Sequence, residues 1–281
     1  MYYSKLAETY QKLENITGKL KMTDIVANLF QSAPEDTLPM LATLVRGKPF
    51  PTRSQKELEV GESLAKEAIS IATGATKKEI EEKWRETGDL GKTAGFFLKH
   101  RKQMTLTQKK LTVDDVLDNL DKIAKASGSG SQKRKVKLLA ELITVAEPLE
   151  ARYIVRTVLE ELRVGVGEGI VRDAIAQAFE VSPELVERAY FLRGNYGKVI
   201  TIAKEQGEEG LNKVEIELGT PIKVMLAQKA TSIEEAFEDC GKPAQFEYKY
   251  DGFRMLIHKK GEEIQLFSRR LEAITKQFPE I

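Results

Sequence analysis

Residues 138–146 read LLAELITVA, and their spacing decides the fold class of most of the chain. Apolar side chains recur three and four positions apart, at Leu138, Leu139, Leu142, Ile143 and Ala146. This spacing puts them on one face of an α-helix, whereas a half-buried strand would alternate with a period of two. The same pattern holds from the N-terminus to about Gln206 with almost no strand signal. We therefore predict an all-helical domain over residues 1–206, with roughly ten short helices.

Helix-start signals agree with this prediction. Two pairs, Thr76 with Glu79 and Thr112 with Asp115, have the spacing of a capping box, in which each residue's side chain accepts from the other's backbone amide. Ser182 precedes a proline, as an N-cap residue often does.

Composition limits the possible classes of protein. The 281 residues include 41% hydrophobic ones, enough for one or two cores, which excludes a disordered chain. The sequence has neither a membrane-spanning run nor a signal-peptide pattern, so we expect a cytoplasmic protein. Cys240 is the only cysteine, and His100 and His258 have no second ligand at metal spacing. No disulfide or zinc site is expected.

Charge is informative only locally, because 44 basic residues nearly balance 43 acidic ones and the net charge is +1. Residues 91–111 and 125–137 hold several Lys and Arg and no acid. From these stretches and one further cation we select the candidate phosphate contacts Lys92, Lys99, Arg101, Lys133, Arg134 and Arg193.

Three connections between predicted helices are rich in glycine, at residues 127–131, 163–169 and 193–197. Bare backbone there can approach a phosphate closely, with the amides of the next helix N-terminus as donors. For any single loop, a helix C-cap or a tight turn is the favoured interpretation of the glycines. Three such loops beside basic residues favour a nucleic-acid surface.

The pattern changes after the polar, glycine-bounded stretch 206–210, which we interpret as the domain boundary. A second domain is expected over residues 216–281, with a short helix from Ser232 to Asp239. Beyond it, residues 246–250 alternate aromatic with charged, and Asp251-Gly252 predicts a tight turn. Strands at 253–259 and 264–268 would complete a β-meander.

The predicted hairpin has a chemical consequence. A two-residue turn at 251–252 would pair Lys249 with Arg254 and place both on one face with Glu247. A lysine amine is a nucleophile only when neutral, and a nearby guanidinium and partial burial both favour that form. The arrangement suits a lysine that attacks a phosphoryl group, although spacing alone would favour an ordinary solvated hairpin face.

Three segments resemble one enzyme family. Residues 247–254, EYKYDGFR, resemble the E-x-K-x-D-G-x-R signature of covalent nucleotidyltransferases: ATP-dependent DNA ligases, RNA ligases and capping enzymes. Residues 267–275, FSRRLEAIT, are similar to the F-S-R-N-x-E-x-x-T motif of DNA ligases. Residues 220–227, TPIKVMLA, resemble their P-I-R-P-M-L-A strand, with Lys223 for arginine and Val224 for the second proline. Their order matches DNA ligases of the archaeal replicative type, whose DNA-binding domain the helical region also resembles.

The resemblance implies a role for each matching residue. Lys249 would become covalently attached to AMP, Glu247 would bind the adenine, and Arg254 and Arg269 would contact the sugar and phosphates. ATP and Mg²⁺ are the implied cofactors, and nicked double-stranded DNA is the implied partner in replication, repair and recombination. The family's metal carboxylate and OB-fold are expected beyond Ile281, so we expect no metal ligand here. The chain is expected to be a monomer that starts an incomplete adenylation domain and binds DNA without sealing it.

Further hypotheses remain open at this stage. Gln103 to Leu106 lie where archaeal ligases carry a sliding-clamp peptide, but its aromatic pair is missing, and a basic interhelix loop is the alternative. An RNA ligase or capping-type enzyme shares the lysine motif, although the large helical domain argues against it. A non-catalytic helical DNA-binding module with a vestigial hairpin is the third possibility.

Overall fold

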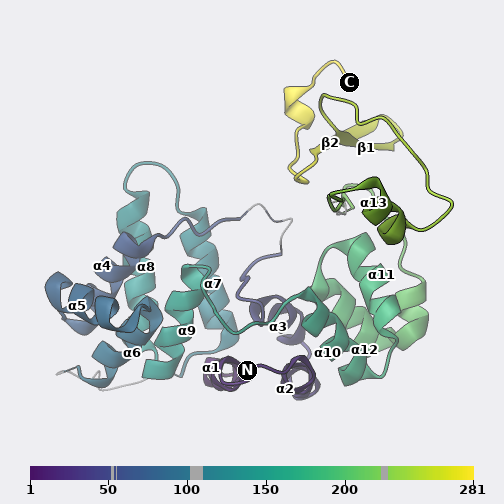
Figure 1. The fold of residues 1–281 in the computed structure, drawn as a ribbon. Coiled ribbons are helices and arrows are strands. Elements are labelled where there is room, and N and C mark those ends of the chain that lie inside the picture. Colours follow the sequence, from purple (N-terminus) through teal and green to yellow (C-terminus); the bar gives the residue numbers. More distant parts are fainter. Residues whose placement is uncertain (52–53, 55, 102–109, 223–226) are drawn as a thin grey trace. The chain divides into compact units, whose positions relative to one another are not determined.

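In the computed structural model the chain forms two compact units, Met1–Glu215 and Ile216–Ile281 (Figure 1). The structure describes residues 1–51, 54, 56–101, 110–222 and 227–281. Helices dominate the first unit, and the second contains a helix and a small antiparallel sheet. The predicted class, mainly α with a short antiparallel β segment, is therefore confirmed. None of the helices in the described residues is long and apolar enough to cross a membrane.

The described residues of the first unit form a succession of helices that share one apolar core. In chain order they are α1 (Tyr3–Glu14), α2 (Lys19–Gln31), α3 (Leu38–Leu44), α4 (Glu62–Thr73), α5 (Lys77–Thr87), α6 (Leu90–Lys99), α7 (Val113–Lys125), α8 (Ser131–Val145), α9 (Pro148–Val158), α10 (Glu168–Phe179), α11 (Pro183–Arg193) and α12 (Tyr196–Asn212). Both predicted capping boxes are present, at the starts of α5 and α7.

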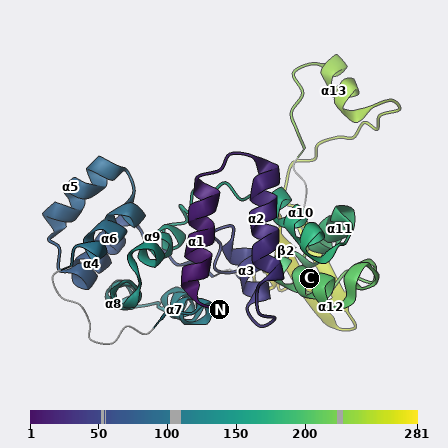
Figure 2. The ribbon, with the colours of Figure 1, turned by 90° about the horizontal axis from the view of Figure 1, so that it is seen from below.

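Packing within this unit brings distant segments together. Helix α9 packs on α6 and α1, α10 packs on α2, and α12 packs on α3 and α11; α1 and α2 lie side by side in Figure 2. The approach of α6 to α9 is close, since a Cβ at Gly91 would lie 2.4 Å from the carbonyl oxygen of Arg152. A Cβ at Gly95 would lie 2.8 Å from that of Pro148. These two glycines therefore set the distance between the helices.

The first unit extends past the boundary predicted at residues 206–210. Helix α12 continues through that stretch, interrupted only by a kink at Gly207, whose φ is 59°. Beyond the kink the chain still belongs to this unit, because Leu211 and Val214 are buried in its core. The side chain of Glu208 also accepts a hydrogen bond from the backbone N–H of Ser182 at 2.7 Å. The glycine-rich stretch is a bend in a helix, and the second unit begins at Ile216.

The second unit contains α13 (Ile233–Cys240), β1 (Met255–Lys260), β2 (Glu263–Ser268) and the 3₁₀ turn η2 (Thr275–Gln277). The strands pair antiparallel, from Met255 opposite Ser268 to Lys260 opposite Glu263. This hairpin and the short helix confirm the predicted helix near Ser232 and the predicted pairing of the last two strands.

The prediction that residues 246–250 form the first strand of a β-meander is wrong. Residues 244–254 form neither helix nor strand, and within the described residues the sheet has only two strands. Tyr248 and Tyr250 are each 88% exposed, although the alternation predicted that they face a core. A strand pattern is stabilised by burial of one face and by neighbouring strands. The described residues supply no such cover for these two rings.

Candidate nucleotide site and nucleic-acid interface

The segment with the lysine motif lies open in the structure. Residues 247–255 curl around an open hollow of about 860 Å³. Glu247, Lys249 and Arg254 are all exposed, and Gln245 Nε2 donates a hydrogen bond to Glu247 Oε1 at 2.7 Å. The predicted cross-strand pairing of Lys249 with Arg254 and the partial burial of the lysine are therefore absent. Their absence follows from the missing first strand, because both depended on its pairing.

The second motif, residues 267–275, folds into a fixed turn after β2. The hydroxyl of Ser268 accepts hydrogen bonds from the backbone N–H groups of Arg270 and Glu272, at 3.2 and 3.3 Å. The backbone N–H of Ser268 donates to the carbonyl oxygen of Glu272 at 2.9 Å, and Leu271 takes a left-handed φ of 66°. Arg269 is exposed on this turn. Serine in this motif is thus explained by the two backbone N–H groups that donate to its hydroxyl.

Sheet register brings two of the predicted nucleotide contacts to one end of the hairpin. Met255 pairs with Ser268, so Arg254, immediately before Met255, and Arg269, immediately after Ser268, flank the same end of the two strands. Two guanidinium groups at one end of a small sheet suit an anionic ligand. Glu247 and Lys249 precede this end of the sheet along the chain.

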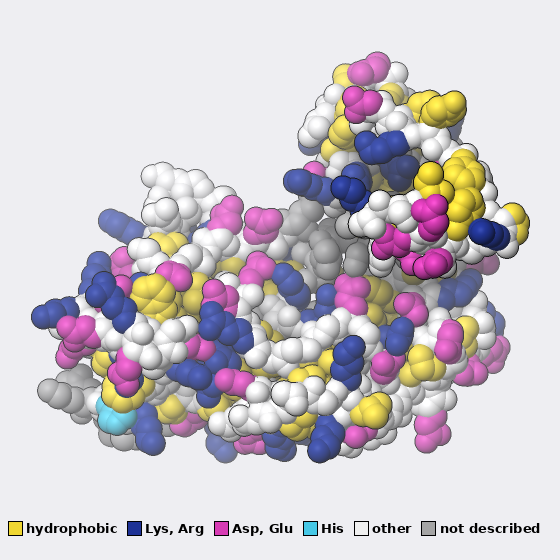
Figure 3. All heavy atoms as spheres, viewed as in Figure 1, with side chains coloured by type: hydrophobic (Ala, Val, Ile, Leu, Met, Phe, Trp, Pro, Cys, Tyr) yellow, Lys and Arg dark blue, Asp and Glu magenta, His cyan; other side chains and the backbone are white. Residues whose placement is uncertain are grey.

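The six candidate phosphate contacts differ in availability. Lys92, Lys99 and Lys133 are exposed. Arg134 is also exposed but donates to the carbonyl oxygen of Ser127 at 2.6 Å. Arg101 is half-buried and donates to the carbonyl oxygen of Thr144 at 2.8 Å, and Arg193 is half-buried in the last turn of α11. On the face seen in Figure 3, basic and acidic side chains of the first unit are interspersed. Basic side chains of the first unit therefore form no continuous patch on that face.

Glycines in the three predicted loops serve backbone conformation. Gly128, Gly130, Gly165 and Gly194 have φ values between 57° and 76°, the left-handed region that other residues rarely adopt. The interpretation of these glycines as helix-cap and turn residues is thus confirmed. At Gly128, Gly130 and Gly167 an added Cβ would meet no atom within 4 Å, so the backbone there faces open space. Close approach of a phosphate therefore remains a prediction for the first two loops.

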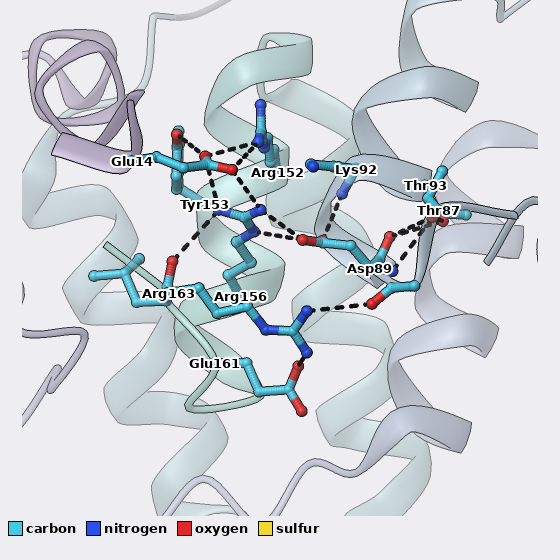
Figure 4. Close-up of polar contacts among 12 residues, drawn as sticks. Glu14, Thr87, Asp89, Lys92, Thr93, Arg152, Tyr153, Arg156, Glu161 and Arg163 are labelled. Carbon is cyan, nitrogen blue, oxygen red and sulfur yellow. Dashed lines mark hydrogen bonds and ion pairs between the residues drawn. The ribbon is translucent and has the colours of Figure 1, made fainter. Parts of the chain in front are cut away.

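A buried ionic cluster of Glu14, Asp89, Arg152, Tyr153 and Arg156 was missed by sequence reasoning (Figure 4). Arg156 is 3% exposed and Asp89 is 5% exposed. Arg156 Nε donates to Asp89 Oδ2 at 3.0 Å, and its Nη1 donates to Glu14 Oε2 at 3.0 Å. Arg152 Nη2 and the hydroxyl of Tyr153 also donate to Glu14, at 2.7 and 2.9 Å. Because these partners are 67 to 142 residues apart, no local pattern could have indicated them.

The cluster is ionised. Burial opposes the charge on Asp89, but hydrogen bonds from Arg156 and from the backbone N–H of Lys92 outweigh it and lower the pKa of Asp89. Burial opposes the charge on Glu14 as well, and hydrogen bonds from Arg156 and Tyr153 lower the pKa of Glu14. Burial also disfavours the charge on Arg156, yet both carboxylates raise the pKa of Arg156. The two carboxylates and two guanidinium groups thus neutralise one another inside the protein.

Beside this cluster, the loop from Glu160 to Gly167 has an unusual backbone. Glu160 and Arg163 take left-handed φ values of 57° and 56° without being glycine. The loop borders an open hollow of about 630 Å³ together with Arg46, which pairs with Glu168 at 3.0 Å. Residues other than glycine keep a left-handed backbone conformation only where neighbouring groups fix them.

The geometry does not test two predictions about ligands, the sliding clamp and the metal ion. Gln103 to Leu106, the candidate clamp peptide, lie outside the described residues, as do Lys223 and Val224. The described residues contain no group of three or more His, Cys, Asp or Glu side chains placed to hold a metal ion.

Comparison with known proteins agrees with the motifs. A family described as "DNA ligase N terminus" matches residues 2–176, and one described as "ATP dependent DNA ligase domain" matches residues 224–281. The chain belongs to the DNA ligase family. Over 281 residues it is 47% identical to a DNA ligase of Thermococcus fumicolans and 48% identical to one of Methanothermobacter thermautotrophicus. A DNA ligase of Archaeoglobus fulgidus is 43% identical over 282 residues.

These family members are longer than the chain. All of its residues are matched in the first two, yet it spans about half of the length of each. The archaeal type inferred from the three motifs is confirmed by these ligases. The matched family is DNA ligase, so the comparisons give no support to the RNA ligase or capping alternative.

Proposed function

We propose that this chain supplies the DNA-binding domain and the nucleotide-attachment lysine of an ATP-dependent DNA ligase. Such an enzyme seals 5′-phosphate to 3′-hydroxyl nicks in duplex DNA and serves replication, repair and recombination. The observation that carries the proposal is the EYKYDGFR segment, which lies in a region similar to the ATP-dependent ligase domain and follows a helical unit similar to the ligase N terminus.

In this proposal Lys249 is the nucleophile. Its neutral Nζ attacks the α-phosphorus of ATP, a phosphoramide bond forms, pyrophosphate leaves, and the amine loses its proton. The exposed position of Lys249 beside an open hollow leaves room for a nucleotide.

Glu247, Arg254 and Arg269 are proposed to bind the nucleotide. Glu247 would accept a hydrogen bond from the adenine, and the two arginines at one end of the hairpin would contact the sugar and phosphates. Mg²⁺ would neutralise the phosphates.

The helical unit is proposed to bind nicked double-stranded DNA as a monomer, through the six candidate cations and the glycine loops. Phosphate contacts of this kind position a protein without reading sequence. A sliding clamp that binds through residues 103–106 remains part of the proposal.

The adenylation role is tested with the protein in a form as long as its relatives, incubated with Mg²⁺ and ATP labelled on the α-phosphate. Replacement of Lys249 by alanine should abolish covalent label and leave duplex binding intact. Replacement of Lys260, an exposed lysine of β1, should leave both the labelling and the duplex binding unchanged. Arg254→Lys and Arg269→Lys should slow labelling despite equal charge, because an ammonium lacks the planar fork that matches phosphate oxygens. Label retained in Lys249→Ala would disprove the assignment.

The DNA-binding role is tested by anisotropy titration of nicked and intact duplex at several salt concentrations. If about five phosphates are neutralised, log affinity should fall against log salt with a slope of about −4 to −5. Sequence preference should be slight, and we expect no nick sealing from the chain alone. Binding that is undetectable or independent of salt would refute this role.

The open lysine segment is the one observation that favours a second candidate, a non-catalytic DNA-binding module. Salt-dependent DNA binding with no covalent adenylate in the long form would favour the module over the ligase.

A further inference from the structure

Arg156, the buried arginine of α9, lies between two surfaces that we assign to DNA. One is the start of α6, where Lys92 is exposed, and the other is the loop at residues 160–167, which leads into α10. We propose that Arg156 is a positioning residue for DNA binding, which holds these two surfaces in one fixed arrangement. This inference rests on the proposed DNA-binding function.

All five N–H groups of the Arg156 guanidinium are engaged. Nε and Nη2 donate to Asp89 Oδ2, at 3.0 and 2.5 Å. Nη1 and Nη2 donate to the two carboxylate oxygens of Glu14, at 3.0 and 3.2 Å. Nη1 also donates to the backbone carbonyl oxygen of Leu162 at 3.4 Å. Only a planar fork can reach these three partners at once, so lysine could not substitute fully.

On one side, Arg156 fixes the start of α6 through Asp89. Asp89 is the N-cap residue of that helix, and its Oδ1 accepts a hydrogen bond from the backbone N–H of Lys92 at 2.9 Å. One carboxylate therefore caps α6 with one oxygen and binds Arg156 with the other. Any shift of Arg156 is transmitted to the first turn of α6, where the Lys92 side chain emerges.

On the other side, Arg156 fixes the loop. Its own backbone carbonyl oxygen accepts a hydrogen bond from the N–H of Glu161 at 2.8 Å, and its guanidinium holds the next carbonyl, that of Leu162. Arg163 Nη1 then donates to the carbonyl oxygen of Gly88, the residue before Asp89. These bonds surround the left-handed residues Glu160 and Arg163, which need such neighbours to keep their conformation.

The loop ends where a phosphate could be bound by backbone. Gly167 is the N-cap of α10 and provides no side-chain cap, so the first-turn amides of that helix have no partner from it. DNA phosphates have fixed spacing, so the loop and the start of α6 can engage one duplex together only if their separation is fixed. Arg156 touches both and is itself shielded from solvent, which fits positioning rather than direct contact.

The test compares Arg156→Met with Arg152→Met in the full chain. Arg152 lies one turn earlier on the same helix and also donates to Glu14, at 2.7 Å, whereas the bonds to Asp89 and Leu162 come from Arg156. Affinity for a nicked duplex is measured at several salt concentrations, below the unfolding temperature of each variant. We expect Arg156→Met to bind about tenfold or more weakly and its salt slope to shrink by about 1 to 2, since one or two phosphate contacts are misplaced. Arg152→Met should keep the wild-type slope.

A purely structural role would lower the unfolding temperature of Arg156→Met without changing the salt slope of its folded form. Wild-type affinity and slope in folded Arg156→Met would therefore overturn the proposal. If that variant does not fold, Arg156→Lys decides: we expect intermediate affinity, a reduced slope and faster hydrogen exchange of the amides at 160–167. Wild-type values for all three would overturn the proposal equally. Failure of the wild-type chain to bind duplex would instead refute the DNA-binding function itself.

Discussion

Asp89 connects a helix cap to a buried ion pair, and its replacement by alanine tests both at once. The change removes the cap of α6, which costs about 1 kcal/mol in comparable helices. It also leaves Arg156 buried with Glu14 as its only carboxylate partner. Breaking a buried pair costs about 3 to 5 kcal/mol, and the remaining partner argues for the low end. We expect Asp89→Ala to lower the free energy of unfolding by about 4 kcal/mol.

Two matched variants separate the contributions. Asp89→Asn keeps an oxygen that can accept from the N–H of Lys92 but loses the charge, so its cost should be about 3 kcal/mol. Thr76→Ala removes the hydroxyl that caps α5 by accepting from the N–H of Glu79, with no buried charge involved, and should cost about 1 kcal/mol. The expected order of destabilisation is therefore Asp89→Ala, then Asp89→Asn, then Thr76→Ala.

Urea unfolding followed by tryptophan fluorescence measures these differences. The chain has one tryptophan, Trp84, which is half-buried in α5 and packs against the core of the first unit. Its emission therefore reports on that unit alone. If Asp89→Ala costs no more than Thr76→Ala, the buried pair contributes nothing beyond the cap, and our account of the cluster is refuted.

Three further predictions concern the same unit. Folding lowers the pKa values of Asp89 and Glu14, so their contribution to stability is complete above their unfolded pKa, about 4, and is lost as pH falls through the folded values. The difference in free energy of unfolding between wild type and Asp89→Asn, measured in urea, should therefore shrink on acidification. A constant difference would contradict this. Burial raises the pKa of Glu150, so the contribution of Glu150 to stability is present below its unfolded pKa and is lost as pH rises through the folded pKa. Glu150→Gln should therefore gain stability relative to wild type from about pH 4 to pH 7. A relative loss of stability over that range would contradict this prediction. Gly91→Ala should lower the free energy of unfolding by at least about 1 to 3 kcal/mol, because its Cβ would lie 2.4 Å from a backbone oxygen of α9. Gly169→Ala is the control, because a Cβ there would meet no atom within 4 Å, and it should be neutral or mildly stabilising in thermal melts.

The sequence predicted what depends on local spacing. The apolar period around Leu142 and the capping pair of Thr112 with Asp115 correspond to α8 and to the start of α7. Both signals operate within one or two helical turns, so no knowledge of the tertiary structure was needed. The motif around Ser268 was recognised by its resemblance to DNA ligases, and the hydroxyl of Ser268 accepts from N–H groups only two and four residues away.

Other features could not be predicted because they depend on distant partners. Residues 246–250 have a clear strand pattern, but a strand needs a neighbour and a covered face, and the described residues provide neither for Tyr248 and Tyr250. The stretch 206–210 has the composition of a linker, yet the chain after Gly207 packs into the core through Leu211. The partners of Arg156 are also far away in the sequence, so its role emerged only from the structure.

The four charges of the buried cluster constrain how this sequence can drift. Loss of any one charge leaves the others unbalanced in the interior, at a cost that is a large fraction of the roughly 5 to 15 kcal/mol that holds a typical domain folded. A neutral replacement of Asp89 would therefore be tolerated only with a simultaneous neutral change at Arg156, which leaves Glu14 paired with Arg152. Single random substitutions should be purged at these positions, while a joint replacement by apolar residues of matching volume could survive folding. Random mutagenesis with selection for folded protein should recover all four charges, or variants in which a carboxylate and an arginine are replaced together, even in a background that no longer needs to bind DNA.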